Sequence, residues 1–179
     1  MTRRLLALLL TTAFAAAPAA LTAQLSTHLT LAGGVSVPSG NLKQIADAGY
    51  NLAAGLDIGA PLVPIGVRLE GGYNGFNLKG TGGGTARAIS GTVNAVLALG
   101  PTGASPYLIG GVGIYNSNAP STIFVSSGKT VGGVNVGAGL RFPLGIISTF
   151  VEARYHQMLG NATDGSDWKF IPITFGVSF

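Results

Sequence analysis

Hydrophobic and polar residues alternate with a period of two along most of this chain. Because successive side chains on a strand point to opposite faces, this alternation predicts β-strands with one apolar and one polar face. Clusters of proline, glycine and polar residues separate the alternating segments and indicate turns. The pattern predicts eight strands, at 25–37, 50–60, 65–76, 86–99, 106–115, 130–142, 146–156 and 170–179.

The last segment shows the pattern most clearly. One face carries Ile171, Ile173, Phe175, Val177 and Phe179, and the other carries Pro172, Thr174, Gly176 and Ser178. A strand of about ten residues with one apolar face is long enough to cross a bilayer when it is tilted. We therefore expect the apolar faces to point outward into lipid and the polar faces to point inward.

The fifth segment fits this scheme least well. Leu108, Val112 and Ile114 fall on the face that we assign inward, whereas Tyr107 and Tyr115 fall on the outward face. With this assignment all five tyrosines, and also Phe142 and Phe179, point outward. The aromatic residues are sorted by position along the strands. Tyr50, Tyr73, Tyr115, Tyr155 and Trp168 lie near one end of their strands, and Tyr107, Phe142 and Phe179 lie near the other. Two aromatic girdles are typical of a membrane barrel.

Short and long connections alternate along the chain. Short turns are expected at 61–64, 100–105 and 143–145, and longer loops near 38–49, 77–85, 116–129 and 159–167. Short periplasmic turns and longer outer loops give this rhythm in outer-membrane barrels, and an even strand count leaves both termini periplasmic. In the first loop, the segment 41–48 with Lys43 and Asp47 is compatible with a helical turn.

The first residues indicate an export signal. Arg3 and Arg4 precede an apolar stretch at 5–17, and small residues follow. Cleavage after Ala23 divides the chain into a signal peptide at 1–23 and one domain at 24–179, and cleavage near Ala19 is a second candidate. An uncleaved anchor is the alternative, although the apolar core is shorter than the roughly 20 residues of a spanning helix.

Composition narrows the possible architecture. Hydrophobic residues make up 47% of the chain, charged residues 9%, and there is no cysteine. After the signal no run of about 18 apolar residues occurs, so spanning helices are not expected. Because every backbone polar group in hydrocarbon must be paired internally, a closed barrel is the remaining way to span. Removing Arg3 and Arg4 lowers the net charge from +4 to +2, and the scattered basic residues give no support for nucleic-acid binding.

The closing strand, its terminal Phe179 and the segment 150–156 (FVEARYH) resemble the small OmpA-like and OmpX-like outer-membrane proteins. The resemblance implies an all-β fold, an eight-stranded antiparallel up-and-down transmembrane β-barrel in a Gram-negative-type outer membrane. It also implies that Phe179 belongs to a signal read by the barrel-assembly machinery. Outer-membrane lipids and lipopolysaccharide are then the expected surroundings, and a monomer is the expected state.

Charged residues on the inward faces are the candidate site. They are Asp57, Arg68, Glu70, Arg141, Glu152 and Arg154. Eight strands enclose a space that side chains can fill, and buried charges must be paired. If the turn at 61–64 is centred between residues 62 and 63, Asp57 lies opposite Arg68. These residues predict a structural salt-bridge network, with a gated ion path as the alternative. Glycines 133, 137 and 139 leave room for residues 150, 152 and 154 on the next strand.

Catalysis has little support in the sequence. Lipid A deacylases of this fold carry a His-x-Ser motif near the end of the penultimate strand, but here the sequence is His156-Gln157-Met158 and His156 is assigned to the lumen. His28 and His156 lie on distant strands, so neither a metal site nor another cofactor is expected. A structural or surface-interaction protein is therefore the favoured function. A narrow channel for ions or small solutes is the alternative, and a lipid-modifying enzyme is less favoured.

Overall fold

The computed structural model describes residues 25–60, 63–80, 84–100, 104–118, 128–160 and 167–179. These ranges contain eight strands, one for each predicted segment. They are β1 (Ser26–Gly40), β2 (Ala46–Gly59), β3 (Ile65–Leu78), β4 (Thr85–Ala98), β5 (Ser105–Asn118), β6 (Lys129–Leu144), β7 (Ile147–Leu159) and β8 (Trp168–Ser178). A short helix, α2 (Leu42–Ile45), lies within the segment for which a helical turn is expected. No helix in the described ranges has both the length and the apolar character needed to cross a membrane.

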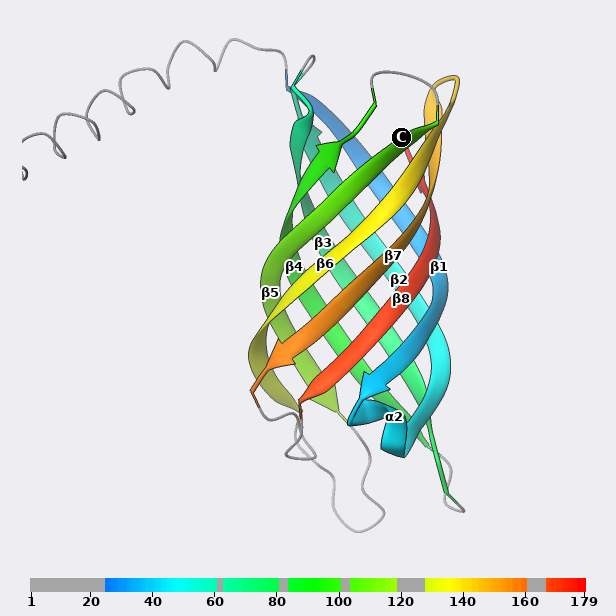
Figure 1. The fold of residues 1–179 in the computed structure, drawn as a ribbon, viewed down its shortest axis with the longest axis vertical. Coiled ribbons are helices and arrows are strands. Elements are labelled where there is room, and N and C mark those ends of the chain that lie inside the picture. Colours follow the sequence, from blue (N-terminus) through cyan, green and yellow to red (C-terminus); the bar gives the residue numbers. More distant parts are fainter. Residues whose placement is uncertain (1–24, 61–62, 81–83, 101–103, 119–127, 161–166) are drawn as a thin grey trace, which may run out of the picture.

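The strands form one closed antiparallel barrel (Figure 1). Each strand pairs with its neighbour in the chain, and β8 pairs with β1 to close the sheet. At the closure, the backbones of Leu29 and Phe179 exchange two hydrogen bonds of 2.8 and 3.0 Å. A closed sheet has no unpaired edge, which is the condition for spanning hydrocarbon with strands. The predicted eight-stranded up-and-down antiparallel barrel is confirmed.

The outer wall carries large apolar side chains that none of the other described residues covers. Leu52, Val93 and Phe175 are each more than half exposed. In water such a surface is an aggregation hazard, whereas lipid tails cover it in a membrane. The predicted faces are correct on seven strands; on β7, for example, Val151 is exposed and Glu152 is buried.

On β5 the predicted faces are wrong. Val112 and Ile114 are 62% and 64% exposed and point outward with Leu108, whereas Tyr107 and Tyr115 are buried in the lumen. The alternation is ambiguous here because both faces carry large apolar residues and three glycines interrupt them. The lumen accepts these tyrosines because each packs in an apolar cluster inside it. Tyr115 belongs to the cluster at the α2 end, and Tyr107 packs with Val96, Ile109 and Phe150.

The prediction of two aromatic girdles is confirmed only in part. Of the aromatic residues that the prediction placed in the two girdles, those on the outward faces are Tyr50, Tyr73, Tyr155, Phe142 and Phe179. Trp168 is fully buried inside the barrel, like the two β5 tyrosines, so none of these three meets lipid. Trp168 has inward parity on β8, because it is two residues from Phe170 and four from Pro172, which are also buried.

The two ends of the barrel differ. In Figure 1 the end of β8 lies at one end of the barrel, and α2 lies at the other, between β1 and β2. At the C-terminal end, β6 and β7 are joined by Gly145 and Ile146 alone, and Gly145 has a φ of 69°, a conformation that favours glycine. The expected loops at 77–85, 116–129 and 159–167 and the turns at 61–64 and 100–105 fall partly outside the described residues.

Inward-facing glycines on β6 make space for charged residues on β7. Gly137 lies opposite Arg154, and Gly139 lies opposite Glu152, as predicted. A Cβ atom at Gly137 would stand 2.7 Å from the Cα of Arg154. The third predicted glycine, Gly133, instead lies opposite Met158. Missing side chains on one strand thus admit long side chains from its neighbour.

Candidate functional site

Arg68 lies at the centre of the lumen and is 1% exposed. Its Nε and Nη2 atoms donate hydrogen bonds to the two carboxylate oxygens of Asp57, at 2.5 and 3.0 Å. Its Nη1 atom donates to Glu152 at 3.1 Å. The guanidinium also lies over the ring of Phe150, 5.1 Å from its centroid. A paired, bidentate geometry of this kind is the strongest form of arginine–carboxylate contact.

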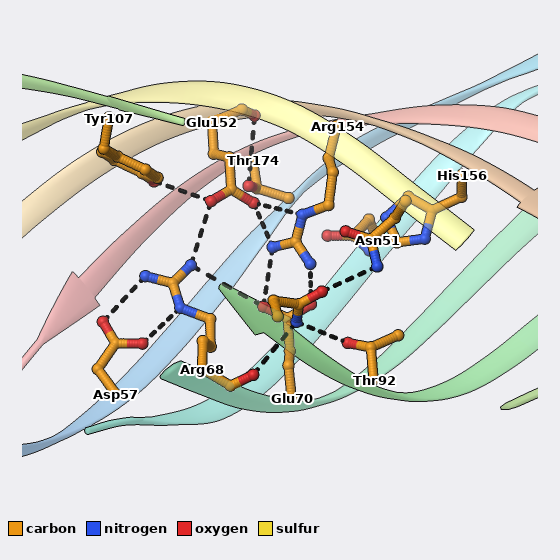
Figure 2. A network of polar contacts seen from close by, with 12 residues as sticks. Asn51, Asp57, Arg68, Glu70, Thr92, Tyr107, Glu152, Arg154, His156 and Thr174 are labelled. Atoms are coloured by element: carbon orange, nitrogen blue, oxygen red, sulfur yellow. Dashed lines mark hydrogen bonds and ion pairs between the residues drawn. The ribbon is translucent and has the colours of Figure 1, made fainter. Parts of the chain in front are cut away.

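Arg154 forms a second centre on the neighbouring level of the lumen. Its Nη1 and Nη2 atoms donate to the two carboxylate oxygens of Glu70, at 2.9 and 3.0 Å. Its Nε atom donates to Glu152 at 2.8 Å, and Nη2 contacts the same oxygen. Glu152 therefore joins the two arginines, and Figure 2 shows how its carboxylate lies between them.

Arg141 completes the network from β6, because its Nη2 atom donates to Asp57 at 3.0 Å. We call the six residues Asp57, Arg68, Glu70, Arg141, Glu152 and Arg154 the lumen network. It contains three acids and three arginines, so its formal charge is zero. Desolvating each ion costs several kcal/mol, and only pairing with good geometry and further hydrogen bonds offsets that cost. The cross-lumen contacts meet this requirement.

The spacing in the sequence explains the arrangement. Arg68 and Glu70 are two residues apart on β3, and Glu152 and Arg154 are two residues apart on β7, so both pairs point inward. The two strands carry their charges in opposite order. Asp57 lies opposite Arg68 in the β2–β3 register, which confirms the predicted pairing.

A layer of amides lies next to the lumen network, towards the α2 end. Asn135 donates to Asn94 at 2.8 Å, and Asn51 donates to Asn74 at 2.9 Å. A cavity of about 20 Å³ lies between this layer and Arg154. That volume admits roughly one water molecule. The Oδ1 atom of Asn51, whose residue lines the cavity, has no hydrogen-bond partner among the described residues.

Apolar side chains close the lumen at the α2 end. We call this cluster the outer plug; its fully buried members are Leu42, Ala46, Phe76, Ala86, Ala88, Tyr115, Met158, Trp168 and Phe170. His156 lies beneath it, stacked on Phe170 with 5.0 Å between ring centroids. The Nδ1 atom of His156 is 2.9 Å from the hydroxyl of Tyr115. The inward position predicted for His156 is confirmed, and Met158, in the place of the motif serine, is also buried.

The opposite end of the lumen is open. A vestibule of about 190 Å³ is lined by His28, Asp57 and Arg141 among others. His28 lies opposite Asp57 in the β1–β2 register but remains exposed at the mouth. Arg141 is 36% exposed, and its guanidinium lies over the ring of Tyr107 at 5.6 Å. The vestibule therefore ends at the lumen network.

All six inward charges singled out from the sequence meet in one network, whereas Phe179 lies apart at the barrel closure. The sequence reasoning missed Tyr107, whose hydroxyl donates to Glu152 at 2.9 Å. It also missed the outer plug. One feature of the sequence could have indicated both. Near some strand ends, large apolar residues occur on both faces of the strand, so that some of them must point into the lumen.

One comparison with a solved structure supports this architecture, and two further structures are similar at lower scores. Neisserial surface protein A is similar over 86% of this chain and 97% of its own, with a TM-score of 0.65 and 12% identity. The N-terminal β-barrel domain of Pseudomonas aeruginosa OprF (TM-score 0.48, 17% identity) covers 86% of this chain and 97% of its own. The attachment invasion locus protein Ail of Yersinia pestis (TM-score 0.47, 19% identity) covers 86% and 95%. At such identities the likeness to Neisserial surface protein A shows the fold alone.

No curated protein matches the sequence significantly. The family profile described as "Outer membrane protein beta-barrel domain" matches residues 6–179. This match spans nearly the whole chain, and the closed barrel with its apolar outer wall agrees with it. The chain belongs to the outer membrane protein β-barrel domain family.

Proposed function

We propose that this protein is a closed, non-conducting barrel that serves a structural or surface-interaction role in the outer membrane. The observation that carries the proposal is the filling of the lumen. The lumen network occupies its centre, and the outer plug fills the end at α2. A barrel built in this way is a rigid mount for the loops that its strands carry.

The orientation follows from the expected periplasmic termini. The α2 end then faces outside, and the vestibule beside Asp57 faces the periplasm. Outer-membrane lipids and lipopolysaccharide surround the wall, the barrel-assembly machinery inserts the chain after its signal peptide is removed, and the barrel works as a monomer. A catalytic role is not part of the proposal, because His156 is enclosed in the lumen and Met158 stands where a nucleophile would be needed.

Recording from planar bilayers tests the proposal. Purified, folded protein should give no steady conductance, and insertion should be verified separately by protease protection and by heat-modifiable migration in electrophoresis. A general porin reconstituted in the same way serves as the positive control for the recording. Reproducible single-channel steps from inserted protein would reject the closed barrel.

A narrow channel is the second candidate, and the vestibule together with the water-sized cavity favours it. In that case the outer plug and the lumen network are the barriers to ion flow. The double substitution Phe76→Ala and Trp168→Ala removes two large members of the plug. A conductance already present in the wild type and increased by this change would support the channel.

A further inference from the structure

Among the described residues, the charged side chains outside the lumen are confined to one end of the barrel. Eight basic residues follow the signal segment, and three of them are the lumen arginines. The other five are Lys43, Lys79, Arg87, Lys129 and Lys169, and all lie at or next to the α2 ends of the strands. The opposite end of the outer wall has no basic residue in the described ranges. This asymmetry gives the α2 end a cationic rim.

Arg87 differs from the other cations because of its place on the wall. It is exposed on the outward face of β4, and no acidic side chain of the described residues lies within ion-pair distance of it. Lys79, in contrast, is paired with Asp47 at 3.4 Å. Arg87 lies opposite Gly75 on β3, which in turn lies opposite Tyr50 on β2. These three positions form one row across the outer wall.

Aromatic rings occupy this row and the next. The ring of Tyr50 covers Gly75, where an added Cβ would lie 2.9 Å from the Cε1 atom of that ring. Tyr50 also stacks on Tyr73, with ring centroids 5.7 Å apart. Tyrosine at this depth places its ring among acyl chains and its hydroxyl at the level of lipid headgroups. If the outward tyrosines mark the membrane interface, as girdle residues do in barrels, Arg87 in the same row lies at headgroup level.

A hollow in the outer wall begins directly beneath the tyrosines. Ala54, Gly71 and Gly91 lie side by side on β2, β3 and β4, two residues past the row of Tyr73. Two shallow, open depressions of the outer wall meet at Ala54 and Gly71, and mostly apolar residues line them. Gly91 is four residues from Arg87, which is about 13 Å along the strand.

We infer that this wall of β2, β3 and β4 binds a phosphorylated, acylated glycolipid of the outer leaflet. Its phosphate lies on Arg87 and the Tyr50 hydroxyl, and one acyl chain lies in the hollow over Gly71. Arginine binds phosphate through two parallel hydrogen bonds, which suits a headgroup at a fixed place better than a mobile lysine does. The charge is complementary, and the apolar hollow continues from it in the direction that an acyl chain takes.

Native mass spectrometry of the purified barrel with bisphosphorylated lipid A tests the inference. Wild-type protein should bind it, and Arg87→Gln should weaken the affinity about tenfold, as expected for one charged hydrogen-bonding group. Lys129→Gln is the matched control, because it removes a cation of the same rim on β6, two strands from Arg87 and outside the lining of the hollow. It should change the affinity by less than about twofold.

Two further arms separate the headgroup from the chain. Dephosphorylated lipid A should bind about as weakly to wild type as the phosphorylated form binds to Arg87→Gln. Gly71→Leu fills the hollow without changing charge. The fold should persist, because a Cβ there meets only the backbone oxygen of Ala54, at 4.0 Å. This substitution should also weaken binding. Equal losses for Arg87→Gln and Lys129→Gln, or equal binding of the two lipids, would overturn the inference.

The inference rests on the proposed orientation but not on a closed lumen. Orientation is checked independently, since the chain has no cysteine and Lys129 is exposed. A Lys129→Cys variant should react with a membrane-impermeant maleimide on intact cells. Labelling only after the membrane is broken would place the α2 end inside and refute both the orientation and the glycolipid site. Lipid binding tests the glycolipid site, and conductance tests the closed barrel. Either proposal can therefore fail while the other stands.

Discussion

Removing Arg68 should destabilise the barrel more than removing its partner Asp57. Arg68→Met keeps much of the side chain's volume but leaves the lumen with three acids and two arginines, and Asp57 and Glu152 each lose a direct partner. Breaking a buried pair on one side typically costs about 3–5 kcal/mol. Asp57→Asn leaves Arg68 bound to Glu152, and the Arg141 that it also releases is partly exposed to solvent. We expect that change to cost about 1–3 kcal/mol.

The double variant isolates the interaction itself. Once Arg68 is absent, Asp57→Asn should cost little or even restore stability, so the coupling energy between the two positions should be at least about 1 kcal/mol. Reversible unfolding of the barrel in lipid vesicles by denaturant measures these values. The fluorescence of Trp168, the single tryptophan of the chain and fully buried in the outer plug, reports the transition.

A pair on the surface provides the comparison. Lys79 and Asp47 are 3.4 Å apart but 42% and 68% exposed, and the same cycle there should give a coupling below about 1 kcal/mol. Additive effects of the Arg68 and Asp57 substitutions, or a coupling no larger than that of the surface pair, would refute the reasoning that the lumen network is an interdependent unit.

The outward position of β5 predicts that Val112→Arg impairs folding into lipid by about 2–4 kcal/mol relative to Val112→Ala, and an equal folded yield of the two would return β5 to its sequence-based assignment. Gly176→Ala would place a Cβ against the ring of Phe150 and should lower the unfolding midpoint. Gly71→Ala, whose Cβ would meet only the backbone oxygen of Ala54 at 4.0 Å, should not; the two midpoints are compared in the same denaturant. Deletion of Phe179 removes two closing hydrogen bonds and the expected assembly signal, so the heat-resistant fraction in the outer membrane should fall at moderate expression, and an unchanged fraction would count against that role.

The strands and the lumen network could be predicted from the sequence, because both follow from which residues fall on the same face of a strand. Asp57, Arg68, Glu152 and Arg154 are polar residues at inward positions of otherwise clear strands, and a symmetric turn placed two of them opposite each other. The face assigned to a residue does not change when the predicted end of its strand is wrong by one or two residues. The charge balance of the inward faces then required the residues to pair.

The sequence failed where an apolar residue points inward. The rule that lipid attracts the apolar face assumes a polar lumen, but this lumen also holds two apolar clusters that are packed like a protein core. Tyr107 and Tyr115 pack in these apolar clusters and not against lipid, so the faces predicted for β5 are inverted. Trp168 packs in the same way, so its predicted place in a girdle is wrong. Periodicity carries no information on depth along the barrel axis, and so it does not separate a lipid-facing ring from one in a plug.

The ion pairs across the lumen also constrain the order in which the barrel folds. Three of these contacts, Arg68–Glu152, Arg141–Asp57 and Arg154–Glu70, each join residues 84 positions apart in the chain. They connect the β2–β3 hairpin with the β6–β7 hairpin, which do not neighbour each other in the sheet. Contacts between such distant positions form late, after the entropy of closing the long loop has been overcome. The six charges therefore remain hydrated until the sheet curls, and expulsion of their water belongs to the last step of folding.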